Sequence, residues 1–293
     1  MIARLGKYLL AKEAHAVFVA FICALLPLFY FPTGFLAVII IGLVTLQKGP
    51  KAGFYILAWT ALPSIALFFL HRAGVFDLLL LRFVLIWMLA SLLYHYHSWS
   101  LLLEIIALVG VVLILLLHLF VSNVDAWWVE KLTAYMQGVV SNTHWKLSVS
   151  PSEFATRLAP IATGVTGFCF TMSLLIDLIV SRWWQAILVC PGEFGKEFIQ
   201  IRTGYVAVVF ATLLLVLVLF KVPVAMDAFP LALFPFFVAG LSLLHFWASK
   251  KKSLIYFLIL IYVGLFLLPA LIVSILALIA LIDTRRDFRK KVI

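Results

Sequence analysis

The chain has 293 residues, of which 66% are hydrophobic and 12% are charged, and its formal net charge is +10. Its mean hydropathy of +1.21 excludes an ordinary soluble domain, because too few polar residues remain to cover a core of this size. The apolar runs are continuous, which excludes a transmembrane β-barrel with its alternating strands. The composition therefore predicts an all-α fold, a polytopic transmembrane helical bundle that forms one membrane domain over residues 1–293.

The apolar runs set the expected number of membrane crossings, because about 20 apolar residues span the hydrocarbon core as a helix. They predict about ten spans, or nine if 253–283 is one tilted helix and not a hairpin turning near Pro269. Spans are expected at 14–30, 33–47, 53–70, 76–94, 99–121, 159–181, 205–220 and 229–248, followed by the pair within 253–283. The domain divides into a first five-helix part (10–121), an outer-face amphipathic segment (122–158), a C-terminal helical part (159–283) and a basic cytoplasmic tail (284–293).

The positions of the basic residues predict the orientation of the chain. If the N-terminus is inside, most of the 22 Lys and Arg residues fall on the inner side, including those of "VTLQKGPKAGFY" and "DTRRDFRKK". Because basic loops stay on the cytoplasmic side, both termini are expected to be cytoplasmic. The positive charge then marks the inner membrane face, and no nucleic-acid partner is expected.

The 122–158 segment is expected on the outer face of the membrane. Its apolar residues recur at helical spacing, which predicts an amphipathic helix on the membrane surface. After it, Ser150 is expected to cap the next helix, with Pro151 in the first turn and Glu153 as the capping-box partner.

Ionisable residues inside the spans are costly in hydrocarbon, which makes them candidate functional residues. Arg82 is expected to snorkel outward or pair with Asp77, with ligand binding as the alternative. Asp177 lies about one turn from Arg182, so a structural pair is expected there, with a proton or cation relay as the alternative. Glu104 leaves the same choice between a structural and a functional role.

His118 and the tryptophans lie near the ends of the expected spans. His118 is either a satisfied core histidine or a ligand-binding residue, and the tryptophans indicate an interfacial aromatic belt. His95 and His97 in "YHYHSWS" point to different sides of a helix, so no metal site is expected, and the aromatic belt needs no cofactor to explain it. The candidate ligand-binding residues are Arg82, His118, Trp127 and Trp128.

Two further features are candidate partner contacts. The loop "SRWWQAILVCPGEFGKEFIQIRTG" predicts a short helix that either lies on the inner membrane surface or docks a partner. Small residues at a four-residue interval in the first span let another helix approach closely. The candidate partner-contact residues are Ala16, Ala20, Ala24, Trp183, Trp184, Phe194 and Phe198.

The alanine stripe, the Pro-containing turn after it and "GLVTLQKGPKAG" resemble the start of the S components of energy-coupling-factor vitamin transporters. This resemblance implies a small-molecule solute and, as partners, a coupling membrane subunit and an ATPase. S components have six spans, so the extra C-terminal helices lack a counterpart in that family.

The later pieces "TGVTGFCF", "SRWWQAILVCPGEFGKEF" and "LIDTRRDFRK" resemble the YybS-like family of uncharacterised bacterial integral membrane proteins, which is distantly related to S components. That resemblance implies a multi-pass protein of the bacterial inner (plasma) membrane, and it brings no substrate or active site.

A solute-binding or transport-related subunit is the function expected from these features. The alternative is a non-transporting membrane scaffold or regulatory protein. Gly-x-Ser-x-Gly and His-Glu-x-x-His motifs are missing, so no enzyme is expected.

Overall fold

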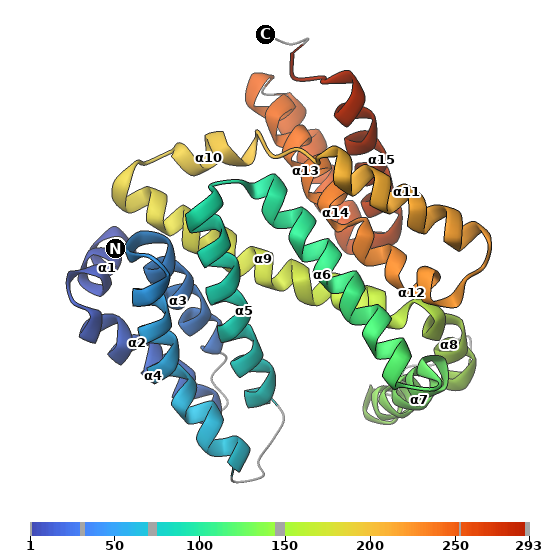
Figure 1. The fold of residues 1–293 in the computed structure, drawn as a ribbon, viewed down its shortest axis with the longest axis horizontal. Coiled ribbons are helices and arrows are strands. Elements are labelled where there is room, and N and C mark those ends of the chain that lie inside the picture. Colours follow the sequence, from blue (N-terminus) through green and yellow to red (C-terminus); the bar gives the residue numbers. More distant parts are fainter. Residues whose placement is uncertain (1, 30–32, 70–74, 144–149, 252, 291–293) are drawn as a thin grey trace. The chain divides into compact units, whose positions relative to one another are not determined.

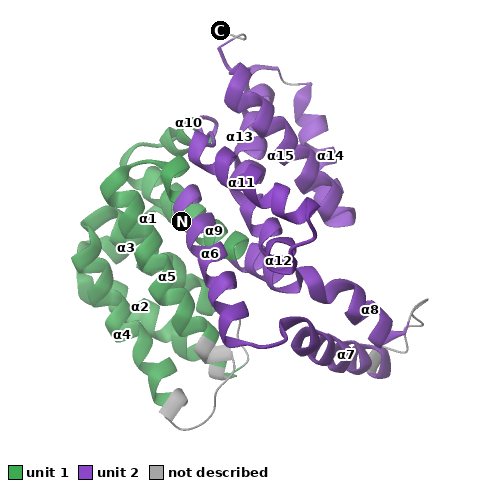
Figure 2. Ribbon diagram, turned by 45° about the vertical axis from the view of Figure 1, so that its right-hand side comes forward, with its two compact units in different colours: residues 1–102, 171–198 green, residues 103–170, 199–293 purple. Residues whose placement is uncertain are grey.

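A computed structural model describes residues 2–29, 33–69, 75–143, 150–251 and 253–290 (Figure 1). Within these ranges every regular element is helical, which confirms the predicted all-α class. The helices form two compact units, coloured separately in Figure 2. Unit 1 contains residues 1–102 and 171–198, and unit 2 contains residues 103–170 and 199–293.

Unit 1 is built around a central helix, α3. This helix is apolar on every side and buried from Ala37 to Leu46, because α2, α4 and α5 pack around it. Gly42 lets α9 approach, since a Cβ at this position would lie 2.5 Å from the Ser181 Oγ. The helices are α1 (Ile2–Ala11), α2 (Glu13–Leu25), the 3-10 turn η1 (Leu26–Phe29), α3 (Gly34–Lys48), α4 (Pro50–Phe69), α5 (Val75–Tyr96), the start of α6 (Trp99–Phe120), the end of α9 (Ala162–Val189) and α10 (Glu193–Phe198).

Unit 2 is centred on α13, which is buried along most of its length and packs against α15. The two backbones come close at Gly240, where a Cβ would lie 2.3 Å from the Leu276 carbonyl oxygen. Besides the remaining parts of α6 and α9, the helices are α7 (Val124–Thr143), α8 (Pro151–Leu158), the 3-10 turn η2 (Ala159–Ile161), α11 (Tyr205–Leu219), α12 (Pro223–Ala232), α13 (Phe234–Lys250), α14 (Leu254–Leu267) and α15 (Pro269–Arg286).

Four helical segments of the described chain are long and apolar enough to cross a membrane: Leu78–Tyr96, Trp99–Phe120, Pro151–Val189 and Pro223–Lys250. A fifth is counted if α1 and α2, bent by 117° at their junction, are taken together. The structure thus fits a membrane protein with four or five candidate spans, fewer than the ten expected. Several of the expected spans form only short apolar helices, namely α3, α11 and α14 with 15, 15 and 14 residues.

Local predictions between the spans agree with the structure at two places. The 253–283 run breaks at Leu268, between α14 and α15, beside the turn expected near Pro269. Ser150 caps α8, because its Oγ accepts a hydrogen bond from the Glu153 backbone N–H at 3.2 Å. The Glu153 carboxylate does not complete the expected capping box but accepts a hydrogen bond from Arg157 at 2.6 Å.

Candidate functional site

Unit 1 contains an ion pair between two candidate spans. Arg82 of α5 donates a hydrogen bond from Nη2 to the Asp177 Oδ2 of α9. The side chains are 22% and 7% exposed, so the pair lies inside the helix packing. Burying either charge alone would be costly in an apolar medium, and each side chain therefore neutralises the other.

This pairing differs from both pairs expected from the sequence. The Asp77 side chain, the expected partner of Arg82, lies outside the described residues. The expected Asp177–Arg182 pair is wrong, because Arg182 instead donates from Nε to the Glu197 Oε2 at 3.1 Å. The Asp177–Arg182 pair does not form because Arg82 on the facing helix α5 binds the Asp177 carboxylate, whereas the Arg182 side chain extends toward α10.

A polar pocket of about 230 Å3 in unit 1 brings three sequence motifs together. From "GLVTLQKGPKAG", the Leu46 carbonyl accepts a hydrogen bond from Gln185 at 2.7 Å. From "YHYHSWS", the Trp99 indole N–H donates to Glu197 at 3.4 Å. Because Arg182 and Glu197 also bind each other, the polar groups here largely satisfy one another, and they hold the 182–198 segment against the rest of unit 1.

The candidate partner-contact residues differ widely in exposure. Ala16, Ala20 and Ala24 are completely buried, so the small-residue stripe is covered by this chain itself. Trp184 is also buried, and its indole N–H donates to the Ile2 carbonyl at 3.2 Å. Trp183, in contrast, is 42% exposed and is available to lipid or to another protein.

Phe194 and Phe198 lie on the short helix α10. Their rings are 5.9 Å apart between centroids, and Phe194 packs edge-on against Trp99 at 6.1 Å. Both side chains are only half-buried. The two aromatic rings therefore serve the packing of unit 1 and still present part of their surface outward.

Unit 2 contains a second polar centre, formed by His118 of α6 and Asp227 of α12. Asp227 is 1% exposed, and its Oδ1 accepts a hydrogen bond from the Gly164 backbone N–H at 2.9 Å. Its Oδ2 lies 3.7 Å from the His118 Nε2 and accepts no hydrogen bond from any described residue. The His118 Nδ1 bonds the Ile114 carbonyl at 3.0 Å.

The tautomer of His118 decides what this centre can do. A carbonyl oxygen is only an acceptor, so Nδ1 must carry the hydrogen that it shares with Ile114. In the neutral imidazole, Nε2 is then an acceptor as well, and it faces the acceptor Oδ2 of Asp227. Two acceptors 3.7 Å apart can both be satisfied by a donor group placed between them. The centre therefore offers two hydrogen-bond acceptors to a donor.

The helices around this centre meet at a glycine. A Cβ on Gly164 would lie 1.7 Å from the Asp227 carbonyl oxygen, so only glycine allows α9 and α12 to approach this closely. The neighbouring Thr163 Oγ1 accepts a hydrogen bond from the Trp128 indole N–H at 2.8 Å. Two of the candidate ligand-binding residues, His118 and Trp128, are thus brought to the same region.

The other two candidate ligand-binding residues lie elsewhere. Arg82 belongs to unit 1, and Trp127 is 44% exposed beside Trp128, with 4.8 Å between their ring centroids. Asp227 was not predicted, because the expected span began at residue 229 and left this acid in a loop. The signal was present in "PVAMDAFPLA", where a single carboxylate stands within an otherwise apolar stretch.

Comparison with known proteins adds no relationship: no protein-family model, curated protein or solved structure matches this chain. In the described ranges, no group of three or more His, Cys, Asp or Glu side chains is placed to hold a metal ion.

Proposed function

We propose that this chain is a solute-binding, transport-related subunit of a bacterial inner membrane, and that His118 and Asp227 form the polar centre of its solute site. The observation that supports this most directly is the Asp227 Oδ2, a buried carboxylate oxygen that faces His118 and receives no hydrogen bond from the described residues. The S-component-like opening of the sequence supports a role alongside a coupling subunit and an ATPase.

The chemistry of the centre defines the solute class. A carboxylate oxygen and an imidazole lone pair both accept hydrogen bonds, so the complementary solute carries an N–H or O–H donor, and a cationic amine fits best. The three helices that supply the Gly164 backbone N–H, His118 and Asp227 all belong to candidate spans. A bound amine would then sit within the membrane-spanning part of the protein, as transported solutes do.

Solute binding should depend on the Asp227 carboxylate. We expect Asp227→Asn to weaken binding of a small amine by about ten- to a hundredfold, because a hydrogen bond to a charged group contributes about 1.5–3 kcal/mol. The measurement is a thermal-shift screen of amines and alcohols on the full chain in nanodiscs, together with mass spectrometry of co-purified solutes.

Asp125→Asn provides a matched control, since it removes an exposed carboxylate from α7. It should leave the amine-dependent shift unchanged. If no co-purified solute is found and no amine or alcohol shifts the wild-type chain, the proposal fails. It also fails if Asp227→Asn and Asp125→Asn bind equally well.

We also propose that both termini face the cytoplasm and that the shorter apolar helices complete a total of about ten crossings. The distribution of basic residues supports this orientation. Reporter tags fused after Lys51, Gln137 and Ile293 should read inside, outside and inside. A middle tag on the same side as the other two would overturn this topology.

A further inference from the structure

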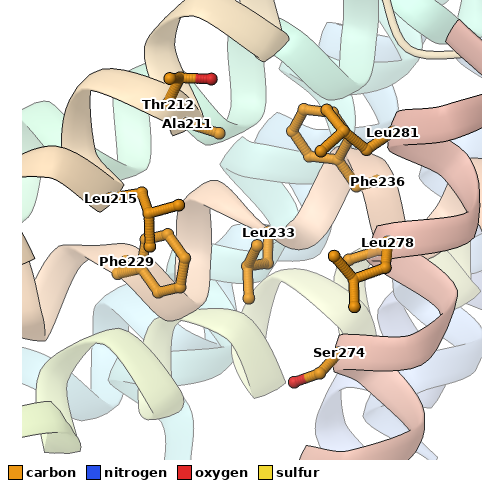
Figure 3. A pocket seen from close by; sticks show the side chains of 10 residues that line it. Ala211, Thr212, Leu215, Phe229, Leu233, Phe236, Ser274, Leu278 and Leu281 are labelled. Atoms are coloured by element: carbon orange, nitrogen blue, oxygen red, sulfur yellow. The ribbon is translucent and has the colours of Figure 1, made fainter.

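Two neighbouring cavities in unit 2 lie along α11 and α15. Figure 3 shows the first, about 250 Å3 in volume, with side chains of α11 and α15 around it and Phe229, Leu233 and Phe236 alongside. The second has a volume of about 720 Å3. Thr212 and Leu281 line both cavities, so the two cavities adjoin, and together they are called the groove.

The groove has a direction. At one end it is lined by Tyr205 and Arg286, and at the other by Leu215 and Ser274. As the residue numbers rise along α11, those on α15 fall, so the two helices run antiparallel beside the groove. From Ser274 to Arg286 the rise of α15 is about 18 Å, and one leaflet of the hydrocarbon core is about 15 Å deep. The groove is therefore as long as one lipid leaflet.

One end of the groove is basic, because Arg285 and Arg286 line it. Both side chains are exposed, and neither forms an ion pair with a described residue. The neighbouring carboxylates are already engaged: Asp287 accepts from the Arg202 Nη1 at 2.8 Å, and the Asp283 Oδ2 lies 3.7 Å from the Arg202 Nε. The positive charge of Arg285 and Arg286 is thus not neutralised within this end.

Glu104, the third carboxylate of this region, is engaged as well. Its Oε1 accepts a hydrogen bond from the Gly204 backbone N–H at 2.7 Å, at the start of α11. This contact gives Glu104 a structural role, as a cap for α11. Among the described residues, the Glu104 carboxylate forms no ion pair with Arg285 or Arg286.

The chain after α15 holds this basic end in place. Asp287 ends the helix in a left-handed conformation with φ 43°, and the Phe288 N–H donates to the Asp283 Oδ1 at 2.8 Å. Arg289 is 8% exposed, and its Nη2 donates to the Ile201 carbonyl at 2.9 Å. Partial burial opposes ionisation of Asp287, but the hydrogen bond and charge of Arg202, together with Lys290, lower the Asp287 pKa below its usual value.

We propose that this groove binds one anionic glycerophospholipid, with its phosphate on Arg285 and Arg286 and an acyl chain along Leu215 and Leu278. Charge complementarity selects the phosphate, and the apolar walls, one leaflet long, select a lipid chain. The proposal does not depend on the solute site: α12 contributes Phe229 to the groove, but His118, Asp227 and Gly164 do not line it.

Native mass spectrometry tests the proposal on the full chain, purified in detergent with equal phosphatidylglycerol and phosphatidylcholine. We expect one phosphatidylglycerol to be retained on the wild-type chain. Arg285→Gln with Arg286→Gln should lower its retention by about tenfold or more. Ser274→Trp, which places an indole at the apolar end, should also lower it. Lys250→Gln with Lys251→Gln removes the same charge at the exposed end of α13 and should have no effect.

Several outcomes would overturn the proposal. Equal retention of phosphatidylcholine would show that charge does not select the occupant. Unchanged retention of phosphatidylglycerol in the double arginine variant would show that the phosphate does not bind at this end. Unchanged retention in Ser274→Trp would show that the acyl chain lies elsewhere. Displacement of the lipid by inorganic phosphate would show that the arginines bind a soluble anion. A dimer without bound lipid would show that a second copy of the chain occupies the groove.

Discussion

Replacing Arg82 by leucine should destabilise the protein by about 3–5 kcal/mol, because the change leaves the Asp177 carboxylate buried without its partner. The Asp177 side chain is only 7% exposed and lies in a candidate span, where neither water nor lipid can solvate the charge. Thermal or chemical unfolding in detergent, followed by intrinsic tryptophan fluorescence, measures the change.

The double variant Arg82→Leu with Asp177→Leu should recover most of the lost stability, since two apolar side chains replace the ion pair as a unit. Arg157→Leu is the matched control. It breaks the exposed Arg157–Glu153 pair of α8, which is worth about 1 kcal/mol at most. If Arg82→Leu destabilises no more than Arg157→Leu, or if the double variant is less stable than the single one, the pair does not stabilise unit 1.

Gly164→Ala is the second change with a large expected effect. The new Cβ would lie 1.7 Å from the Asp227 backbone oxygen, far inside van der Waals contact, so α9 and α12 must separate. Overpacking of this kind costs about 1–3 kcal/mol or more. We expect a lower unfolding temperature and, in the fraction that still folds, loss of amine binding, because the Gly164 N–H moves away from the Asp227 Oδ1.

Gly138→Ala is a sharp control for this experiment, because both glycines lie in α-helices. A Cβ on Gly138 meets nothing within 4 Å, so alanine should raise stability by about 0.5–1 kcal/mol through its higher helix propensity. A loss of stability in Gly164→Ala together with a gain in Gly138→Ala is the result that identifies a close helix contact at Gly164. Equal effects of the two substitutions would refute that contact.

The sequence predicted features that depend on neighbouring residues. The Ser150 cap of α8 was recognised because the capping residue and the Glu153 backbone N–H that it binds lie within one helical turn. The break near Pro269 was recognised because proline cannot continue a helix that begins before it. Composition likewise gave the helical class, since it sums over the whole chain.

Contacts between distant residues were not predicted. Arg82 and Asp177 are 95 residues apart, and no periodicity relates two charges on different helices. Asp227 was missed for a similar reason, since only the meeting of α6, α9 and α12 gives this acid its backbone donor and its histidine. The structure has fewer helices long enough to cross a membrane than the sequence has apolar runs, because an apolar run shows where hydrophobic residues lie but not how long a helix they form.

The enclosure of α3 has a consequence for how unit 1 meets its surroundings. With 15 residues, α3 is about 22 Å long, well short of a hydrocarbon layer of about 30 Å. A lipid-facing helix of that length would force the bilayer to thin around it. Because α2, α4 and α5 shield α3 from lipid, the length of α3 has to match the neighbouring helices. It does not have to match the thickness of the surrounding membrane.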